Sequence, residues 1–94
     1  MSESSSQRRE VFFAGNVQGV GFRYTAQRIA AGYSVAGFVR NLRDGRVQLV
    51  LEGQPQEIDS FLATLQARMH GYVRNVTVDE LVPTGEFSGF EIRF

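Results

Sequence analysis

Cysteine and lysine are both missing from this chain, and histidine occurs once, at His70. Without cysteine there is no disulfide, no thiolate nucleophile and no zinc–thiolate site. Without lysine, Schiff-base chemistry and the lysine of a Walker-type phosphate loop are excluded. One histidine is too few for a histidine metal cluster and disfavours a histidine-based triad. We expect His70 to be an exposed residue at the C-terminal end of a helix.

An excess of charge is also missing, because 10 basic residues balance 10 acidic ones. A formal net charge of +0 argues against a broad surface for nucleic acid or membrane, so any anion site must be local. No apolar run approaches the roughly 18 residues that span a bilayer, and the N-terminus lacks the apolar segment of a signal peptide. We therefore expect a cytoplasmic protein with no nucleic-acid partner and no membrane partner.

The 94 residues fit one domain. We expect residues 1–8 to form a disordered tail and residues 9–94 to form the folded domain. Hydrophobic periodicity predicts a strand, a helix, two strands joined by a hairpin, a second helix, a strand and a short last strand. The predicted ranges are 11–14, 22–33, 35–41, 46–52, 55–69, 74–82 and 90–94.

This order, βαββαβ plus a short C-terminal strand, predicts a ferredoxin-like α/β fold, an α+β sandwich. Asp44-Gly45 supplies the hairpin turn, which makes the two strands on either side of it antiparallel. Two right-handed crossovers place both helices on one face of a mostly antiparallel sheet. We expect the core between that face and the helices.

Three glycines, Gly15, Gly19 and Gly21, lie between the first strand and the first helix. Such a turn leaves backbone N–H groups free to point at one spot, and the helix N-terminus adds a partial charge of about +0.5 there. Arg23 then lies in the first helical turn, where a cation is normally disfavoured. An anion in the loop would relieve that mismatch, so the segment predicts a cradle for a phosphoryl group. The alternative is a tight turn without a ligand.

The run Val17-Gln18-Gly19-Val20-Gly21-Phe22-Arg23 closely resembles the signature of the acylphosphatases. A second run, Gly37-Phe38-Val39-Arg40-Asn41, followed by Asp44-Gly45-Arg46-Val47 and Glu52-Gly53, resembles the same family. The resemblance extends from about Arg9 to Phe94. It departs at Phe38, where the family usually has Trp, and at Leu42, where many relatives carry a small polar residue.

The resemblance implies an enzyme that hydrolyses the carboxyl–phosphate bond of acyl phosphates without a metal or an organic cofactor. It implies that Arg23 holds the substrate phosphate, that the loop amides cradle its oxygens, and that Asn41 orients the attacking water. The implied phosphate-binding residues are Gly15, Val17, Gln18, Gly19, Val20, Gly21, Phe22 and Arg23. Inorganic phosphate or sulfate is the expected competitive ligand, and the protein is expected to be a monomer. Without the resemblance, Asn41 would be interpreted as a residue that begins the hairpin turn.

The residue inventory suits this reaction. An acyl phosphate expels a carboxylate, whose conjugate acid has a pKa of roughly 4, so no general acid is needed. The phosphoryl group passes through a loose transition state, so no strong base is needed. The reaction then needs only charge stabilisation, which Arg23 and the amides would supply, and a correctly oriented water, which Asn41 would supply. The closeness of Asn41 to Arg23 follows from the resemblance and not from the predicted strands.

Two other functions stay open at this point. The run Gly19-Val20-Gly21-Phe22-Arg23-Tyr24 superficially resembles the aromatic motif of RNA-recognition domains, which share this topology, although that motif belongs on a central strand. A catalytically silent effector-binding domain would have the same fold. Three hairpin arginines, Arg40, Arg43 and Arg46, either steer an anionic substrate or form a solvated loop.

Overall fold

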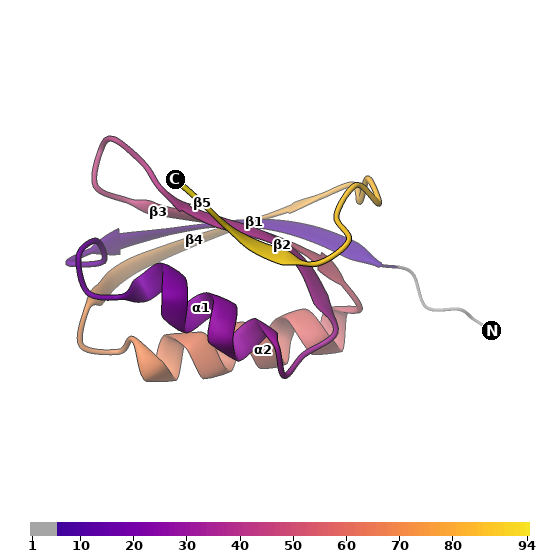
Figure 1. Cartoon of the computed structure of the whole chain (residues 1–94), viewed down its shortest axis with the longest axis horizontal. Helices are drawn as coiled ribbons and strands as arrows, with labels where there is room; N and C mark the ends of the chain where they lie inside the picture. The colour runs from indigo at the N-terminus through magenta and orange to yellow at the C-terminus, as the bar shows by residue number, and fades with distance from the viewer. Residues whose placement is uncertain (1–5) are drawn as a thin grey trace.

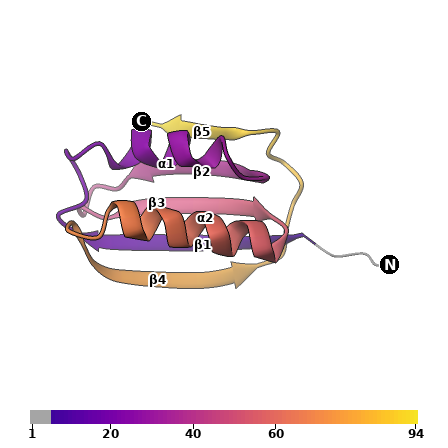
Figure 2. The same ribbon diagram turned by 90° about the horizontal axis from the view of Figure 1, so that it is seen from below.

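The computed structural model describes residues 6–94, and these residues form one five-stranded sheet with two helices on one face (Figure 1). Seen from below, both helices cross the same side of the sheet (Figure 2). The elements are β1 (Gln7–Gly15), α1 (Phe22–Ala30), β2 (Val35–Asn41), β3 (Val47–Gly53), α2 (Pro55–Arg68), β4 (Val73–Leu81) and β5 (Phe90–Arg93). The predicted ferredoxin-like order with its short last strand is confirmed.

The first strand is longer than the sequence analysis predicts. Gln7 and Arg8 pair with Gly53 and Glu52 of β3, so they belong to the sheet and not to a tail over residues 1–8. The prediction missed them because it followed the continuous apolar run from Val11 to Ala14, whereas an ion pair holds Arg8 here: its Nη1 lies 2.7 Å from Glu52 Oε2. Residues 1–5 of the predicted tail lie outside the described residues.

The strand order β4-β1-β3-β2-β5 decides which chain segments meet at the sheet edge. β1 and β2 are both antiparallel to β3, and β5 is parallel to β2. These three strands therefore run in the same direction and end at the same edge. In both views the loop after β1, the β2–β3 hairpin and the C-terminus lie toward that end of the molecule (Figures 1 and 2).

The main core lies between the sheet and the helices, as predicted. The Phe13 ring of β1 lies 4.9 Å, centroid to centroid, from the Phe22 ring in the first turn of α1. Val17, in the loop between these elements, is also fully buried in this core. Burial of such side chains stabilises the fold by about 1.5–3 kcal/mol each, so both ends of the loop are anchored.

Glu52 forms hydrogen bonds that hold the segment after β4 against the face of the sheet opposite the helices. Its carboxylate accepts hydrogen bonds from Arg8 Nη1 (2.7 Å), from the Thr84 N–H (2.9 Å) and hydroxyl (3.1 Å), and from the Gly85 N–H (2.9 Å). Burial by itself raises the pKa of Glu52, but these hydrogen bonds outweigh it and lower the pKa to about 2.

We expect the free energy of unfolding to fall as the pH drops from 4.5, the ordinary pKa of glutamate, toward about 2. Because the pKa of Glu52 is lowered in the folded state, its stabilising effect is complete above the unfolded pKa and is lost as the pH falls through the folded one. Glu52→Gln should be less stable at neutral pH and should show a weaker loss in this acid range. Urea unfolding across the range measures both, with the exposed Glu80→Gln as control. An unchanged acid dependence in Glu52→Gln would contradict this assignment.

Candidate active site

The loop between β1 and α1 is shaped by three glycines with positive φ. The φ angles are 130° at Gly15, 77° at Gly19 and 79° at Gly21, which is the N-cap residue of α1. Gly15 permits close approach as well, because a Cβ there would lie 2.5 Å from the Tyr72 backbone oxygen. The neighbouring Asn16 N–H donates to that same oxygen at 2.9 Å. Because Gly15 has no Cβ, the start of the loop can pack against the beginning of β4.

The rest of the loop presents free hydrogen-bond donors. Within residues 6–94, the backbone N–H groups of residues 17–22 donate no hydrogen bond. No side chain caps the start of α1, and its first turn contains no acidic residue. Free N–H groups at a helix N-terminus carry partial positive charge and favour an anion.

Arg23 adds a full positive charge at the same place. Its Nη1 donates to the Arg93 backbone oxygen at 3.3 Å, and its Cζ lies 4.6 Å from the centre of the Phe94 ring. Within the described part of the chain, Arg23 forms no ion pair with a carboxylate. The end of β5 therefore holds the guanidinium in place without neutralising it.

Asn41 is the last residue of β2, and its side-chain oxygen Oδ1 is buried without a hydrogen-bond partner. No other buried side-chain oxygen or nitrogen among residues 6–94 lacks a partner. Such an atom costs about 1–3 kcal/mol unless a water or a substrate fills the vacant interaction. The alternative interpretation of Asn41 as a turn residue fits less well, because Asp44 has that role: its Oδ1 accepts from the Arg46 N–H at 3.1 Å.

One cavity of about 200 Å³ brings most of the predicted site residues together. Its lining residues are Val17, Gly19, Gly21, Phe22, Arg23, Tyr24 and Asn41. The closeness of Arg23 and Asn41, which the predicted strands could not provide, follows from the sheet: Val47 of β3 pairs with Phe13 of β1 on one side and with Asn41 on the other. No acidic side chain is among the lining residues.

Three predicted loop residues do not line this cavity. Gly15 lies against β4, Val20 packs on the core, and the Gln18 side chain donates to backbone oxygens of the hairpin. Tyr24, which does line it and is 55% exposed, was not predicted. Its position beside Arg23 was the only signal in the sequence, since a tyrosine on a helix has no specific meaning there.

The hairpin arginines have local partners rather than a place in the cavity. Arg40 Nε donates to Gln48 Oε1 at 2.6 Å, and Arg46 Nε lies 2.9 Å from Asp44 Oδ2. The Arg46 guanidinium also lies over the Phe12 ring, with Cζ 4.5 Å from its centre. Neither these two arginines nor Arg43 lines the cavity, and the contacts of Arg40 and Arg46 favour a structural role for those two over steering of the substrate.

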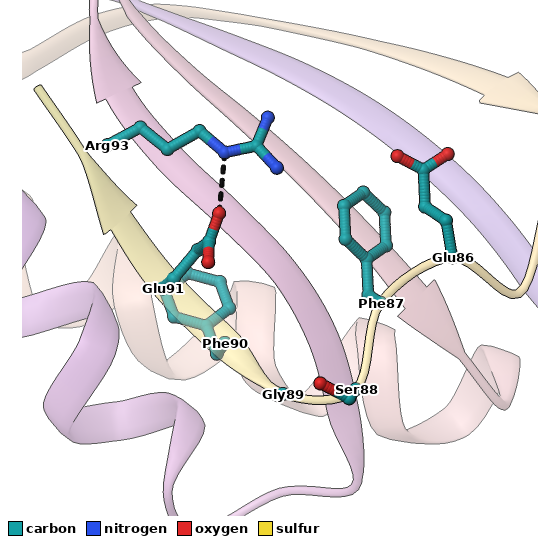
Figure 3. A pocket seen from close by; sticks show the side chains of 7 residues that line it. All are labelled: Glu86, Phe87, Ser88, Gly89, Phe90, Glu91 and Arg93. Carbon is teal, nitrogen blue, oxygen red and sulfur yellow. Dashed lines mark hydrogen bonds and ion pairs between the residues drawn. The ribbon is translucent and has the colours of Figure 1, made fainter.

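A second cavity, of about 260 Å³, lies beside β5 and the loop before it (Figure 3). Its two carboxylates already have arginine partners: Figure 3 shows Glu91 bonded to Arg93 (2.6 Å), and Glu86 Oε1 lies 3.4 Å from Arg8 Nη1. Arg8 also pairs with Glu52, so within the described residues an anionic substrate would find no unpaired cation there. The cavity at Arg23 is therefore the better site for a phosphoryl group.

Within residues 6–94, no group of three or more His, Asp or Glu side chains is arranged to hold a metal ion. In the same residues, no helix has both the length and the apolar character to cross a membrane.

Comparison with known proteins gives a consistent result. The sequence matches the Acylphosphatase family over residues 9–92. It is 42% identical over 91 residues to the acylphosphatase of Methylococcus capsulatus, covering 92% of this chain and 95% of that protein. The crystal structure of acylphosphatase from Bacillus subtilis is similar with a TM-score of 0.84 at 30% identity, over 94% of this chain and 99% of that one. An acylphosphatase from Coxiella burnetii gives a TM-score of 0.83 at 29% identity, over 99% and 100%.

Proposed function

Because this chain belongs to the acylphosphatase family and hydrolyses acyl phosphates, we propose that the cavity between Arg23 and Asn41 is where the hydrolysis takes place. The proposal rests on one observation. Free backbone N–H groups, an arginine without a carboxylate partner and a buried amide oxygen without a partner, each judged within residues 6–94, all belong to one cavity or its wall. A phosphoryl group would supply hydrogen-bond acceptors for the N–H groups and a negative charge for the arginine. A water molecule would supply a donor for the amide oxygen.

The phosphoryl group of the substrate binds at the N-terminal end of α1. Its non-bridging oxygens accept hydrogen bonds from the N–H groups of the loop between Val17 and Phe22, and from Arg23. These donors are fixed before the substrate arrives, so they stabilise the charge of the transition state without rearranging. An arginine in contact with a transferring phosphoryl group is worth about 10³–10⁵ in rate.

A water molecule donates a hydrogen bond to Asn41 Oδ1 and attacks phosphorus from there. As the water oxygen forms its bond to phosphorus, the bond from phosphorus to the carboxylate oxygen breaks, and its electron pair leaves with the carboxylate. Among the described residues, no carboxylate or histidine lines the cavity to accept a proton, so the water proton passes to an oxygen of the phosphate product. The products are a carboxylate and inorganic phosphate, and the loose transition state makes this route accessible.

The purified protein should turn over benzoyl phosphate, and inorganic phosphate should inhibit competitively because it occupies the same donors. Steady-state kinetics at several phosphate concentrations test this. Phosphate titration followed by amide chemical shifts adds the location: the largest shifts should fall within residues 17–23. Shifts centred on the cavity at Glu86 and Arg93 would contradict the proposed site. RNA binding that weakens with salt, in place of turnover, would favour the RNA-binding module.

Three further properties belong to the same proposal. The enzyme acts as a monomer in the cytoplasm, it takes sulfate as well as phosphate as a competing ligand, and it requires no metal or organic cofactor. The chemistry supports the last of these, because a carboxylate leaving group and a loose transition state need charge stabilisation and little else.

A further inference from the structure

The two halves of the proposed site are carried by different chain segments. The phosphate-binding donors lie on the loop between β1 and α1, whereas Asn41 ends β2, and one strand, β3, separates β1 from β2. In-line attack needs the water held in a fixed position relative to the phosphorus. Some contact must therefore fix the loop relative to the end of β2.

Gln18 makes that contact. Its side-chain Nε2 donates to the Leu42 backbone oxygen at 2.8 Å and to the Arg46 backbone oxygen at 2.9 Å. These two oxygens lie at the base of the hairpin, where the Leu42 N–H also donates to the Arg46 oxygen at 2.8 Å. Leu42 follows Asn41 directly, so the Gln18 amide is bonded one residue away from the proposed water-binding side chain.

We propose that Gln18 is a positioning residue for catalysis, whose side chain fixes Asn41 and its water at the right distance from the phosphate loop. This inference rests on the proposed function of Asn41. Gln18 does not line the cavity, so its side chain acts through the hairpin and not on the substrate. Asn41 Oδ1 has no partner among the described residues, so that oxygen takes its position from the backbone that Gln18 holds.

The hairpin does not depend on Gln18 for its own closure. If the Gln18 amide is removed, the Leu42 oxygen still accepts from the Gly45 N–H at 3.2 Å, and the Arg46 oxygen still accepts from the Leu42 N–H. A variant at this position should therefore fold, with the hairpin free to shift relative to the loop. A misplacement of about 1 Å in a reacting geometry can cost on the order of 10² in rate.

The test replaces Gln18 with methionine, which keeps the length of the side chain and removes the donor. We expect kcat for benzoyl phosphate to fall by about 10- to 100-fold, while the inhibition constant of inorganic phosphate changes by less than about threefold. Gln18→Glu, of the same shape, should be at least as slow, because its carboxylate would face two carbonyl oxygens. Gln27→Met, on the exposed face of α1, is the matched control and should keep the normal rate.

A double-mutant cycle with Asn41→Ala separates positioning from a general effect on the loop. If Gln18 acts through Asn41, Gln18→Met should lower the rate by less than about twofold once Asn41 is already alanine. A full additional loss in that background, or a large rise in the phosphate inhibition constant, would overturn the proposal. An Asn41→Ala variant of normal rate would instead refute the water-orienting role itself, so the two failures are distinguishable.

Discussion

Arg23→Ala is expected to abolish phosphate binding and turnover together. The variant loses the one full positive charge among the described residues that line the cavity, so kcat/KM should fall by about 10³–10⁵ and phosphate inhibition should disappear from the accessible range. Arg23→Lys should recover only part of this loss, because a lysine has no planar fork for two phosphate oxygens. Steady-state kinetics with benzoyl phosphate and isothermal titration with inorganic phosphate measure the two effects separately.

Stability gives this prediction a second, independent readout. A cation in the first turn of a helix opposes the macrodipole by about 0.3–1 kcal/mol, and its removal offsets the lost contacts with the Arg93 oxygen and the Phe94 ring. Without phosphate, Arg23→Ala should therefore be about as stable as the parent chain. Arg28→Ala, in the last turn of the same helix, is the matched control: it should keep the rate and lose a little stability. An Arg23→Ala variant that unfolds, or one that retains tight phosphate binding, would contradict the role assigned to this arginine.

The element order could be predicted because local patterns carry it. Apolar spacing identifies the two helices, and Asp44-Gly45 identifies the hairpin. The start of the first strand could not be found in this way, since Arg8 and Arg9 are held by Glu52 and Asp59, partners 44 and 50 residues away. A run of consecutive charged residues such as Arg8, Arg9 and Glu10 does not indicate a strand until the residues that pair with them are placed.

The site was predictable only in part, for a physical reason. The free amides and Arg23 follow from one continuous segment, whose glycines and helix start are visible in the sequence. The approach of Asn41 to that segment depends on β3 lying between β1 and β2, which is a long-range pairing that no local pattern encodes. The Gln18 bond to the hairpin depends on the same pairing. The sequence therefore indicates Gln18 as part of the loop, and the structure shows what its side chain touches.

Leu42 illustrates the same distinction. It stands where the resemblance to the family leads one to expect a small polar residue, but its hydrogen bonds are made by its backbone: the N–H donates to the Arg46 oxygen, and its own oxygen accepts from Gln18 and from the Gly45 N–H. A contribution of the main chain does not require a particular side chain, so the hairpin keeps these bonds with a leucine at this position.

Asn41→Ala is expected to lower turnover by about 10²–10³ while the phosphate inhibition constant stays within about threefold of the parent value. In the proposed site the phosphate donors lie on Arg23 and the loop, whereas Asn41 holds only the water, so binding and turnover should separate. The fold should not suffer, because Oδ1 has no hydrogen-bond partner in the described part of the chain, and its removal ends the burial of an unpaired oxygen. Urea unfolding of the same preparation checks this, with the exposed Asn75→Ala as control.

Asn41→Asp sharpens the distinction between a water held by hydrogen bonding and one activated by a base. A carboxylate at this position would accept a proton from water more readily than an amide, but its negative charge would oppose the phosphoryl group bound nearby. If Asn41 only orients the water, Asn41→Asp should lose turnover and weaken phosphate binding as well, and both effects should diminish as added salt screens the repulsion. A rate in Asn41→Asp above that of the parent chain would show that a base was the missing element, and the orienting role would then be wrong.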